Sequence, residues 1–416
     1  MKTKNKQQKF LNFFKKLGPG IITGASDDDP SGIATYSQAG AQFGLATLWT
    51  ALITFPLMIS IQEMCARIGT VTSIGLTANI KKHYPTPILI LLLLLSVPAI
   101  ILNIGADIAG MGAVANLVLP AIPAYLFSII FTAILMIAII FLPYDKIVAA
   151  LKYLCLSLLL YLIIPFIKRP DWLQVLQHTF IPTVQFNKEY LHILVAILGT
   201  TISPYLFFWQ ATMEAKNKHL VVNKEEIKTM RKDVVFGMFS SNLVMYFIIL
   251  TTGTILFPKG IHQVETIEQA ASALEPLVGK LSYLLFALGV IGTGSLAIPV
   301  LSGSVSYILT SSFNWTEGLD NPFYKAKHFY SIIVISLLIG LGINLIGINP
   351  IQALLYTAIL YGISAPLLIL IILHIANSKK IMGKFVNKKW ANVWGFLTFL
   401  LMSAAALFLL FFYFFD

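Results

Sequence analysis

Long apolar runs, separated by short polar breaks, extend through most of the chain. A helix needs about 20 mostly apolar residues to cross a bilayer, and the chain contains eleven such runs. We expect spanning helices at about 18–44, 46–68, 88–118, 121–142, 146–167, 190–213, 234–257, 280–311, 328–346, 350–376 and 392–414. The pattern therefore predicts an all-α polytopic membrane protein with eleven transmembrane helices.

The composition supports the same class. Of the 416 residues, 57% are hydrophobic and only 11% are charged, whereas an average soluble domain carries roughly 25% charged residues. This leaves too little polar surface for a water-facing globule and excludes a cytosolic enzyme. Cys65 and Cys155 lie in or beside apolar runs, so they indicate neither a disulfide framework nor a cysteine metal site. We expect a multi-pass protein of the cell membrane, with the lipid bilayer as a partner.

The basic residues are distributed unevenly between the predicted loops. If the N-terminus is cytoplasmic, 24 of the 29 Lys and Arg residues lie on the inner side and 5 on the outer side. Cytoplasmic loops are enriched in Lys and Arg, so this split predicts a cytoplasmic N-terminus and an external C-terminus. The net charge of +11 then reflects topology and attraction to anionic lipid. We expect no nucleic-acid partner.

The first predicted span contains three acidic residues in a row, Asp27, Asp28 and Asp29, followed by Pro30. A charge at the centre of a membrane helix costs at least about 2.5–3.5 kcal/mol and usually has a function. Pro30 lacks an N–H donor and disfavours helical geometry at Asp29, so the helix should break there. Carboxylates and freed carbonyls can together bind a cation, although three neighbouring side chains cannot all face one ion. The alternative is a cap on a re-entrant helix end that binds nothing.

A second break is expected in the sixth span. Ser203 and Pro204 interrupt an apolar stretch there, directly after Gly199, Thr200 and Thr201. Spans one and six are five spans apart, so the two broken helices cross the membrane in opposite directions. This is the pattern of a 5+5 inverted repeat with a substrate site at the midplane between the broken helices.

The repeat divides the chain into six segments. They are a basic cytoplasmic N-terminal tail (1–16), a first repeat of five helices (17–168), an external loop (169–189), a second repeat (190–376), a basic cytoplasmic loop (377–391) and an eleventh helix (392–416).

At the broken helices the sequence resembles the Nramp family of divalent-metal transporters. The family pattern Asp-Pro-Gly-Asn, followed by a stretch that ends Gly-Ala-Gln-Phe-Gly, corresponds to Asp-Pro-Ser-Gly at 29–32 and to residues 40–44. The likeness continues with Gln62, Glu63 and Arg67, and it covers about residues 17–376. It implies a LeuT-type (APC) fold in which helices 1 and 6 are unwound at the midplane. It also implies transport rather than enzymatic activity.

Some departures from the family pattern affect which ion the site would favour. Members that move manganese and iron use an Asp, an Asn and a Met thioether, and the Asn and Met positions are here Gly32 and Ser203. Loss of the soft thioether leaves oxygen ligands, which suit hard cations. Mg²⁺ is usually held by one or two carboxylates and keeps several waters. The chain therefore resembles the Nramp-related magnesium transporter branch.

Groups that the family uses for protons are also missing. The family's Asp-x-x-Glu in helix three begins here at Asp107 but ends in Gly110, and two helix-six histidines are replaced by Tyr205 and Gln210. Asn242 keeps a polar family position. No group that titrates near neutral pH remains in the middle of the spans, so we expect transport without proton coupling.

These comparisons give two sets of candidate residues. On this resemblance the metal site is expected to comprise Asp29, Asp28, Gly32, Ser203, Thr200 and Asp27. A second site or a gate is expected to involve Asp107, Asn242, Tyr205 and Gln210.

The expected function is secondary transport that imports divalent metal ions, Mg²⁺ foremost and Mn²⁺ as well, as partly hydrated ions by alternating access. The metal is the transported substrate, no cofactor is expected, and the transport unit is expected to be a monomer. The main alternative is a proton-coupled Mn²⁺/Fe²⁺ symporter of the same fold, with Asp107 in the proton relay. A membrane-embedded hydrolase and a channel are further alternatives, but the sequence offers no nucleophile signature, and two broken helices favour alternating access.

Overall fold

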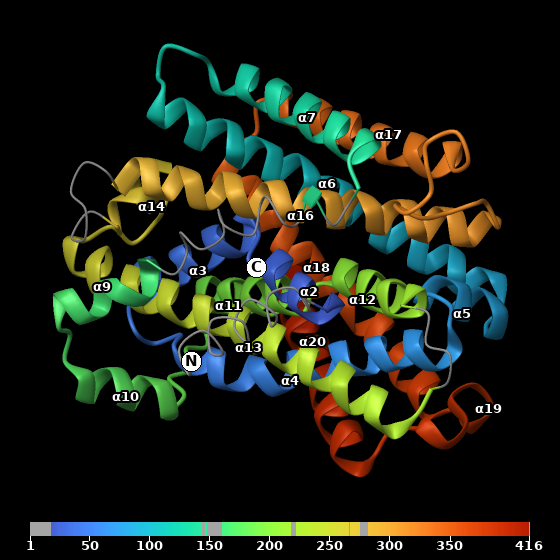
Figure 1. Cartoon of the computed structure of the whole chain (residues 1–416). Helices are drawn as coiled ribbons and strands as arrows, with labels where there is room; N and C mark the ends of the chain where they lie inside the picture. The colour runs from blue at the N-terminus through green and yellow to red at the C-terminus, as the bar shows by residue number, and fades with distance from the viewer. Residues whose placement is uncertain are drawn as a thin grey trace, which may run out of the picture.

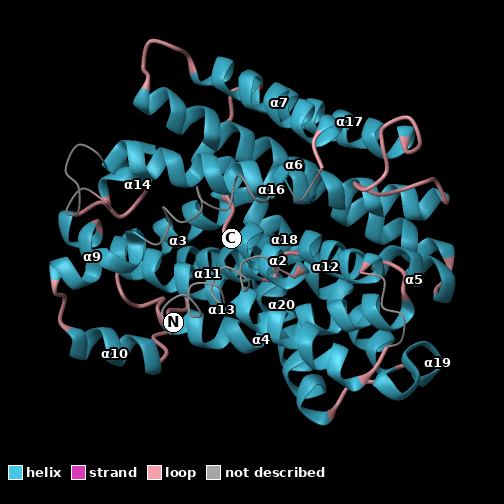
Figure 2. Ribbon diagram, in the orientation of Figure 1, coloured by secondary structure: helices cyan, strands magenta, loops and turns pink. Residues whose placement is uncertain are grey.

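The computed structural model of the chain describes residues 18–143, 146–147, 160–217, 222–265, 267–274 and 282–415. Within these residues the secondary structure is helical and contains no strand (Figure 2). The all-α class is therefore confirmed. The helices are α2 (Pro19–Asp27), α3 (Pro30–Phe43), α4 (Trp49–Thr72), α5 (Leu76–His83), α6 (Thr86–Val118), α7 (Ala124–Phe141), α9 (Leu160–Lys168), α10 (Trp172–Phe180), α11 (Lys188–Thr201), α12 (Pro204–Lys216), α13 (Lys224–Ile255), η2 (Phe257–Lys259), α14 (Ile267–Ser272), α16 (Ser282–Phe313), α17 (Lys327–Asn344), α18 (Pro350–Asn377), α19 (Lys379–Met382), η4 (Gly383–Phe385) and α20 (Lys389–Phe415).

Nine helical segments in the described part of the chain are long and apolar enough to cross a membrane, with α11 and α12 counted together. Two of the eleven predicted spans are not among them. The first is divided between the short helices α2 and α3. Of the fifth, predicted at 146–167, most lies outside the described residues, and its end belongs to α9. The basic tail at 1–16 also lies outside them.

Both predicted helix breaks are present, and they have the same backbone design. In the first, Asp29 is the N-cap of α3 with an extended backbone (ψ 171°), and Pro30 follows at the first helical position. In the second, Ser203 is the N-cap of α12 (ψ 127°), and Pro204 follows. Proline suits this position because its missing N–H would have no partner in the first turn. The sequence rules for helix starts thus account for both restarts.

The broken helices lie inside the bundle. Figure 1 shows α2 and α3 between α16 and α13, and both helices pack against α13. The broken helix of the second half shows the equivalent contact, because α12 packs against α4 of the first half. This exchange is what the predicted inverted repeat requires. Helices α6 and α18 pack against each other and contact α3, so they close the other side of the first break. The two breaks are therefore enclosed by helices from both halves.

Candidate metal site

Asp29 is held rigidly at the first break. It is 2% exposed, and its Oδ1 accepts a hydrogen bond from the Gly32 N–H at 2.8 Å. Its Oδ2 accepts a second one from Nδ2 of Asn103 on α6 at 2.9 Å. Each carboxylate oxygen keeps a further lone pair after these bonds. Asp29 can therefore bind a cation without rearrangement of its own contacts.

Asn103 is itself oriented by α18. The Thr357 hydroxyl lies 3.0 Å from Asn103 Oδ1 and 2.8 Å from the Leu354 carbonyl. When its one hydrogen points to Asn103 Oδ1, the amide N–H₂ is left facing Asp29. Ser31 Oγ lies 3.3 Å from the Thr357 hydroxyl and donates to the Leu354 carbonyl at 2.9 Å. Sequence reasoning missed Asn103 and Thr357. Both are polar residues within apolar spans, and this feature could have identified them from the sequence.

Asp27 and Asp28 face a different helix. Asp27 Oδ2 lies 2.8 Å and Asp28 Oδ1 lies 3.1 Å from the same hydroxyl, that of Ser241 on α13. A serine hydroxyl has one hydrogen to donate, so it cannot satisfy both carboxylates at once. Asp27 Oδ1 has no hydrogen-bond partner among the described residues. Buried carboxylates that lack partners favour a cation nearby.

The three consecutive aspartates thus divide between two sides of the break. Asp29 contacts α6, whereas Asp27 and Asp28 contact α13. Within the described ranges, no three acidic, His or Cys side chains converge as a metal cage. Any ion here would need backbone carbonyls, hydroxyls or water to complete its coordination.

The second break supplies neutral oxygens. Ser203 Oγ donates to the Thr200 carbonyl at 2.7 Å and lies 3.1 Å from the Gly199 carbonyl, so its lone pairs stay available. The second break also lies close to Gly32, because a Cβ atom on residue 32 would be 3.5 Å from Thr200 Oγ1. The same Cβ atom would be 3.3 Å from the carbonyl oxygen of Asp27 in the first break. Glycine at position 32 keeps space between the oxygens of the two breaks.

Asp107 is the fourth carboxylate within the bundle. It lies on α6 and is completely buried, and neither of its oxygens has a hydrogen-bond partner in the described part of the structure. One turn later on α6, Gly110 faces Pro30. The structure thus brings Asp107 to the side of the first break that also holds Asn103.

The remaining predicted residues connect helices around the site. The Tyr205 hydroxyl donates to the Ser26 carbonyl at 2.8 Å, which ties α12 to the end of α2. Gln210 accepts a hydrogen bond from Thr23 on α2 and also donates to Glu214 at 3.1 Å. Asn242 donates to Thr54 on α4 at 2.9 Å, so its neighbour Ser241, and not Asn242 itself, contacts the acids.

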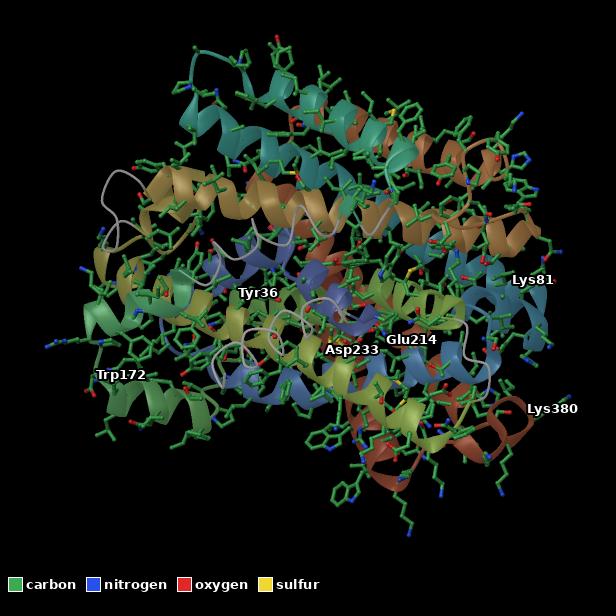
Figure 3. All side chains as sticks on the ribbon, viewed as in Figure 1. Tyr36, Lys81, Trp172, Glu214, Asp233 and Lys380 are labelled. Atoms are coloured by element: carbon green, nitrogen blue, oxygen red, sulfur yellow. The ribbon has the colours of Figure 1, made fainter. Side chains whose placement is uncertain are left out.

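Two further acids lie at the start of α2. Asp233 of α13 accepts a hydrogen bond from the Gly20 N–H at 2.7 Å, and Glu214 of α12 is buried. Figure 3 shows both near the end of α2 that is remote from Tyr36. A carboxylate at a helix N-terminus stabilises the unpaired N–H groups of the first turn. The sequence did not single out either acid, because each lies near a predicted span end.

Two relatives match this chain over most of its length. The "Divalent metal cation transporter MntH" of Bacillus subtilis (strain 168) is 26% identical over 410 residues, which cover 96% of this chain and 93% of that protein. The protein of the same name from Caldanaerobacter subterraneus is 26% identical over 394 residues, 92% of this chain and 90% of its own. These relatives are named as transporters and not as enzymes, in agreement with the expectation from sequence.

Solved structures show the same fold. A structure of the manganese transporter of Eremococcus coleocola superposes with a TM-score of 0.72 at 20% identity and covers 94% of this chain and 85% of that one. Mhp1, a nucleobase-cation-symport-1 family transporter, gives a TM-score of 0.57 at 13% identity, with coverage of 95% and 93%. The predicted LeuT-type fold is thereby confirmed.

The sequence profile of the natural resistance-associated macrophage protein-like family, abbreviated Nramp, matches residues 20–412. The match begins at α2 and ends within α20, so it includes both broken helices and every candidate residue described above. This chain belongs to the Nramp family.

Proposed function

We propose that this protein imports divalent metal cations by alternating access, with Mg²⁺ as the principal substrate and Mn²⁺ as a second one. The observation that carries the proposal is the set of oxygens around the two breaks. Asp29 supplies a charge, and Thr200, Ser203 and the carbonyl of Asp27 supply neutral oxygens. Ser203 stands where the resemblance places a Met ligand. Oxygen ligands without sulfur favour hard cations such as Mg²⁺.

The small residues at the breaks suit a partly hydrated ion. Mg²⁺ dehydrates reluctantly and commonly retains several waters when one or two carboxylates bind it. Gly32 leaves open the space that a side chain would occupy between Thr200 and Asp27. A water that stays on the ion can bridge to these oxygens.

We propose that the membrane potential, and not a proton gradient, drives the uptake. Tyr205 and Gln210, at the positions of the family's histidines, form hydrogen bonds that tie α12 to α2. Neither side chain gains or loses a proton near neutral pH. A divalent ion that crosses a potential of 100 mV gains about 4.6 kcal/mol, twice the value for one elementary charge.

The proposal includes the orientation and the transport unit. The N-terminus is cytoplasmic, the end of α20 is external, and a single chain completes the site, because α2, α3, α11 and α12 all belong to it. Accessibility of a protease-cleavable C-terminal tag on intact cells tests the orientation. Cleavage is expected from outside, and protection of the tag until the cells are opened would reverse the topology.

A second candidate is proton-coupled transport of Mn²⁺. Two observations favour it: the solved structures with this fold include a manganese transporter, and Asp107 is a buried carboxylate without a hydrogen-bond partner among the described residues. Such a group can carry a proton between the two sides of the membrane.

Competition in proteoliposomes separates the two candidates. We expect Mg²⁺ in large excess to suppress uptake of Mn²⁺, because both ions share the oxygen site. Undiminished Mn²⁺ uptake under the same excess would refute the Mg²⁺ assignment. Vesicles without protein control for leakage.

A further inference from the structure

A groove with three cations and three aromatic rings lies on the outer face of the bundle. It has a volume of about 420 Å³ and lies between α4 and α13. Its lining includes Phe55 of α4 and, on α13, Lys228, Arg231, Lys232, Phe236 and Phe239. None of these residues belongs to the metal site described above.

The α13 residues of this groove follow one helical face. Counted from Lys228, the others come at three, four, eight and eleven residues, which are the spacings that align side chains along a helix. The cations occupy the first turns, and the rings follow. From Lys228 to Phe239 the rise is about 16 Å, at 1.5 Å per residue. The face therefore changes from charged to apolar over a distance comparable with a lipid headgroup and the upper part of an acyl chain.

The groove is open to its surroundings. The three cations are exposed, and none of them forms an ion pair within the described ranges. Phe239 is 49% exposed. Its ring meets that of Phe55 edge to face, with 5.7 Å between the centroids, and this contact closes the apolar end. The cations follow the polar start of α13, so they lie where a membrane helix meets the headgroup region.

We propose that this groove binds an anionic phospholipid. Its phosphate lies among Lys228, Arg231 and Lys232, and one acyl chain follows the rings toward Phe55. Two features of the groove select this ligand. The cations complement a negative headgroup, and the exposed rings complement a hydrocarbon chain. A free phosphate would contact the cations but not the rings. A bilayer supplies such lipids at high local concentration.

A lipid in this groove would act on the site through α13. The same helix holds Asp27 and Asp28 through Ser241, and Asp233, next to Lys232, caps the start of α2. The groove and these contacts lie along one continuous helix. The lipid therefore stabilises the position of α13 against α4, on which the first break depends.

Native mass spectrometry of the purified full chain, titrated with phosphatidylglycerol or phosphatidylcholine, tests the site. The variant replaces Lys228, Arg231 and Lys232 together by Gln. A matched control replaces three exposed cations elsewhere, Lys379, Lys380 and Lys388, by Gln; Figure 3 shows Lys380 well apart from Asp233. Each cation at the surface contributes about 1 kcal/mol, so phosphatidylglycerol binding should weaken about fivefold per removed charge in the variant and stay unchanged in the control.

A second variant tests the apolar part of the groove. Substitution Phe236→Ala together with Phe239→Ala should weaken binding of long-chain phosphatidylglycerol and leave a short-chain analogue unaffected. Glycerol phosphate should not displace the lipid. Equal binding of phosphatidylglycerol by the cation variant and its control, equal effects of the Phe pair on both chain lengths, or displacement by glycerol phosphate would each overturn the proposal. None of these substitutions touches the metal site, so failure here leaves the proposed transport intact.

Discussion

The two helix breaks share a backbone design and differ in chemistry. Each begins its second helix with a capping residue in extended conformation followed by proline, Asp29 with Pro30 and Ser203 with Pro204. The first break has three carboxylates, whereas the second has only hydroxyls and carbonyls. The backbone break exposes carbonyls in both cases. We propose that the first break supplies the charge that attracts the cation and that the second determines which cation fits.

The two breaks also differ in how they are anchored. Asp29 is held by Asn103 from another helix, whereas the Ser203 hydroxyl, within the described residues, bonds only to carbonyls of its own chain segment, those of Gly199 and Thr200. An anchor from another helix couples the ligand to the packing of the bundle. A local anchor leaves the second break free to change its side chain without loss of the fold. We therefore expect substitutions at the first break to abolish transport and those at the second to alter selectivity.

The largest effect is expected for Asp29→Asn. Asparagine is as good an N-cap as aspartate, so α3 should still form, but the charge that we propose attracts the cation is lost. Mg²⁺ uptake by proteoliposomes should fall to that of empty vesicles. Asp171→Asn is the matched control, because Asp171 also caps a helix, α10, but is exposed. Appreciable uptake by the Asp29 variant would show that the charge lies elsewhere.

The next effect is expected for Ser203→Met at the second break. A thioether favours softer metals, so the preference should shift toward Mn²⁺ by about tenfold, which corresponds to about 1.4 kcal/mol. The ratio of the inhibition constants of Mg²⁺ and Mn²⁺ in a competition assay measures this preference. Ser203→Ala, which removes the hydroxyl without adding sulfur, should not produce this shift. An equal shift in both variants would contradict the assignment of selectivity to this position.

A smaller effect is expected for Ser241→Ala, which tests the charges of the first break. The hydroxyl is the donor shared by Asp27 and Asp28, and its loss should lower the free energy of unfolding of the ion-free protein by about 1–3 kcal/mol. Added Mg²⁺ should then raise Tm more than in the unaltered protein. The reason is that the cation offsets the repulsion between the Asp27 and Asp28 carboxylates, which the Ser241 hydroxyl no longer reduces. The control is Ser240→Ala, since in the described part of the chain that hydroxyl bonds only to the Phe236 carbonyl, on the exposed face. If both variants respond alike to Mg²⁺, the acids do not sense the ion.

The smallest effect is expected for Gly32→Ala, which narrows the space between the breaks. The added Cβ would lie 3.3 Å from the Asp27 carbonyl and from Tyr36 Cε2, so its neighbours must shift slightly. The KM for Mg²⁺ should rise about threefold, which corresponds to less than 1 kcal/mol. Gly342→Ala is the control, because a Cβ there meets nothing within 4 Å. An unchanged KM in the Gly32 variant would show that the ion does not use this space.

The breaks themselves could be predicted because their causes are local. Proline and consecutive acids in an apolar run conflict with a continuous membrane helix, whatever surrounds them. Nine of the eleven predicted spans correspond to long apolar helices in the described part of the chain. The first span is two short helices, and most of the fifth lies outside the described residues. The inverted arrangement followed from the odd number of spans between the breaks.

The partners of the acids could not be predicted, because they come from distant segments. Asn103, Thr357 and Ser241 reach the first break only through the packing of α6, α18 and α13. The rotation of a helix about its axis is not set by its apolar run. One residue changes the direction of a side chain by about 100°, so the neighbours Ser241 and Asn242 contact Asp27 and Thr54, respectively. The resemblance supplied a position on α13 but not the direction in which its side chain points.

Potential-driven Mg²⁺ transport through the Asp29 site can be measured as uptake of Mg²⁺ into proteoliposomes under a membrane potential, without a pH gradient and with a pH indicator inside. We expect that Mg²⁺ enters the vesicles with the unaltered protein, that the internal pH stays constant, and that Asp29→Asn abolishes the uptake. Uptake that requires a pH gradient, or acidification that accompanies the metal, would contradict this expectation.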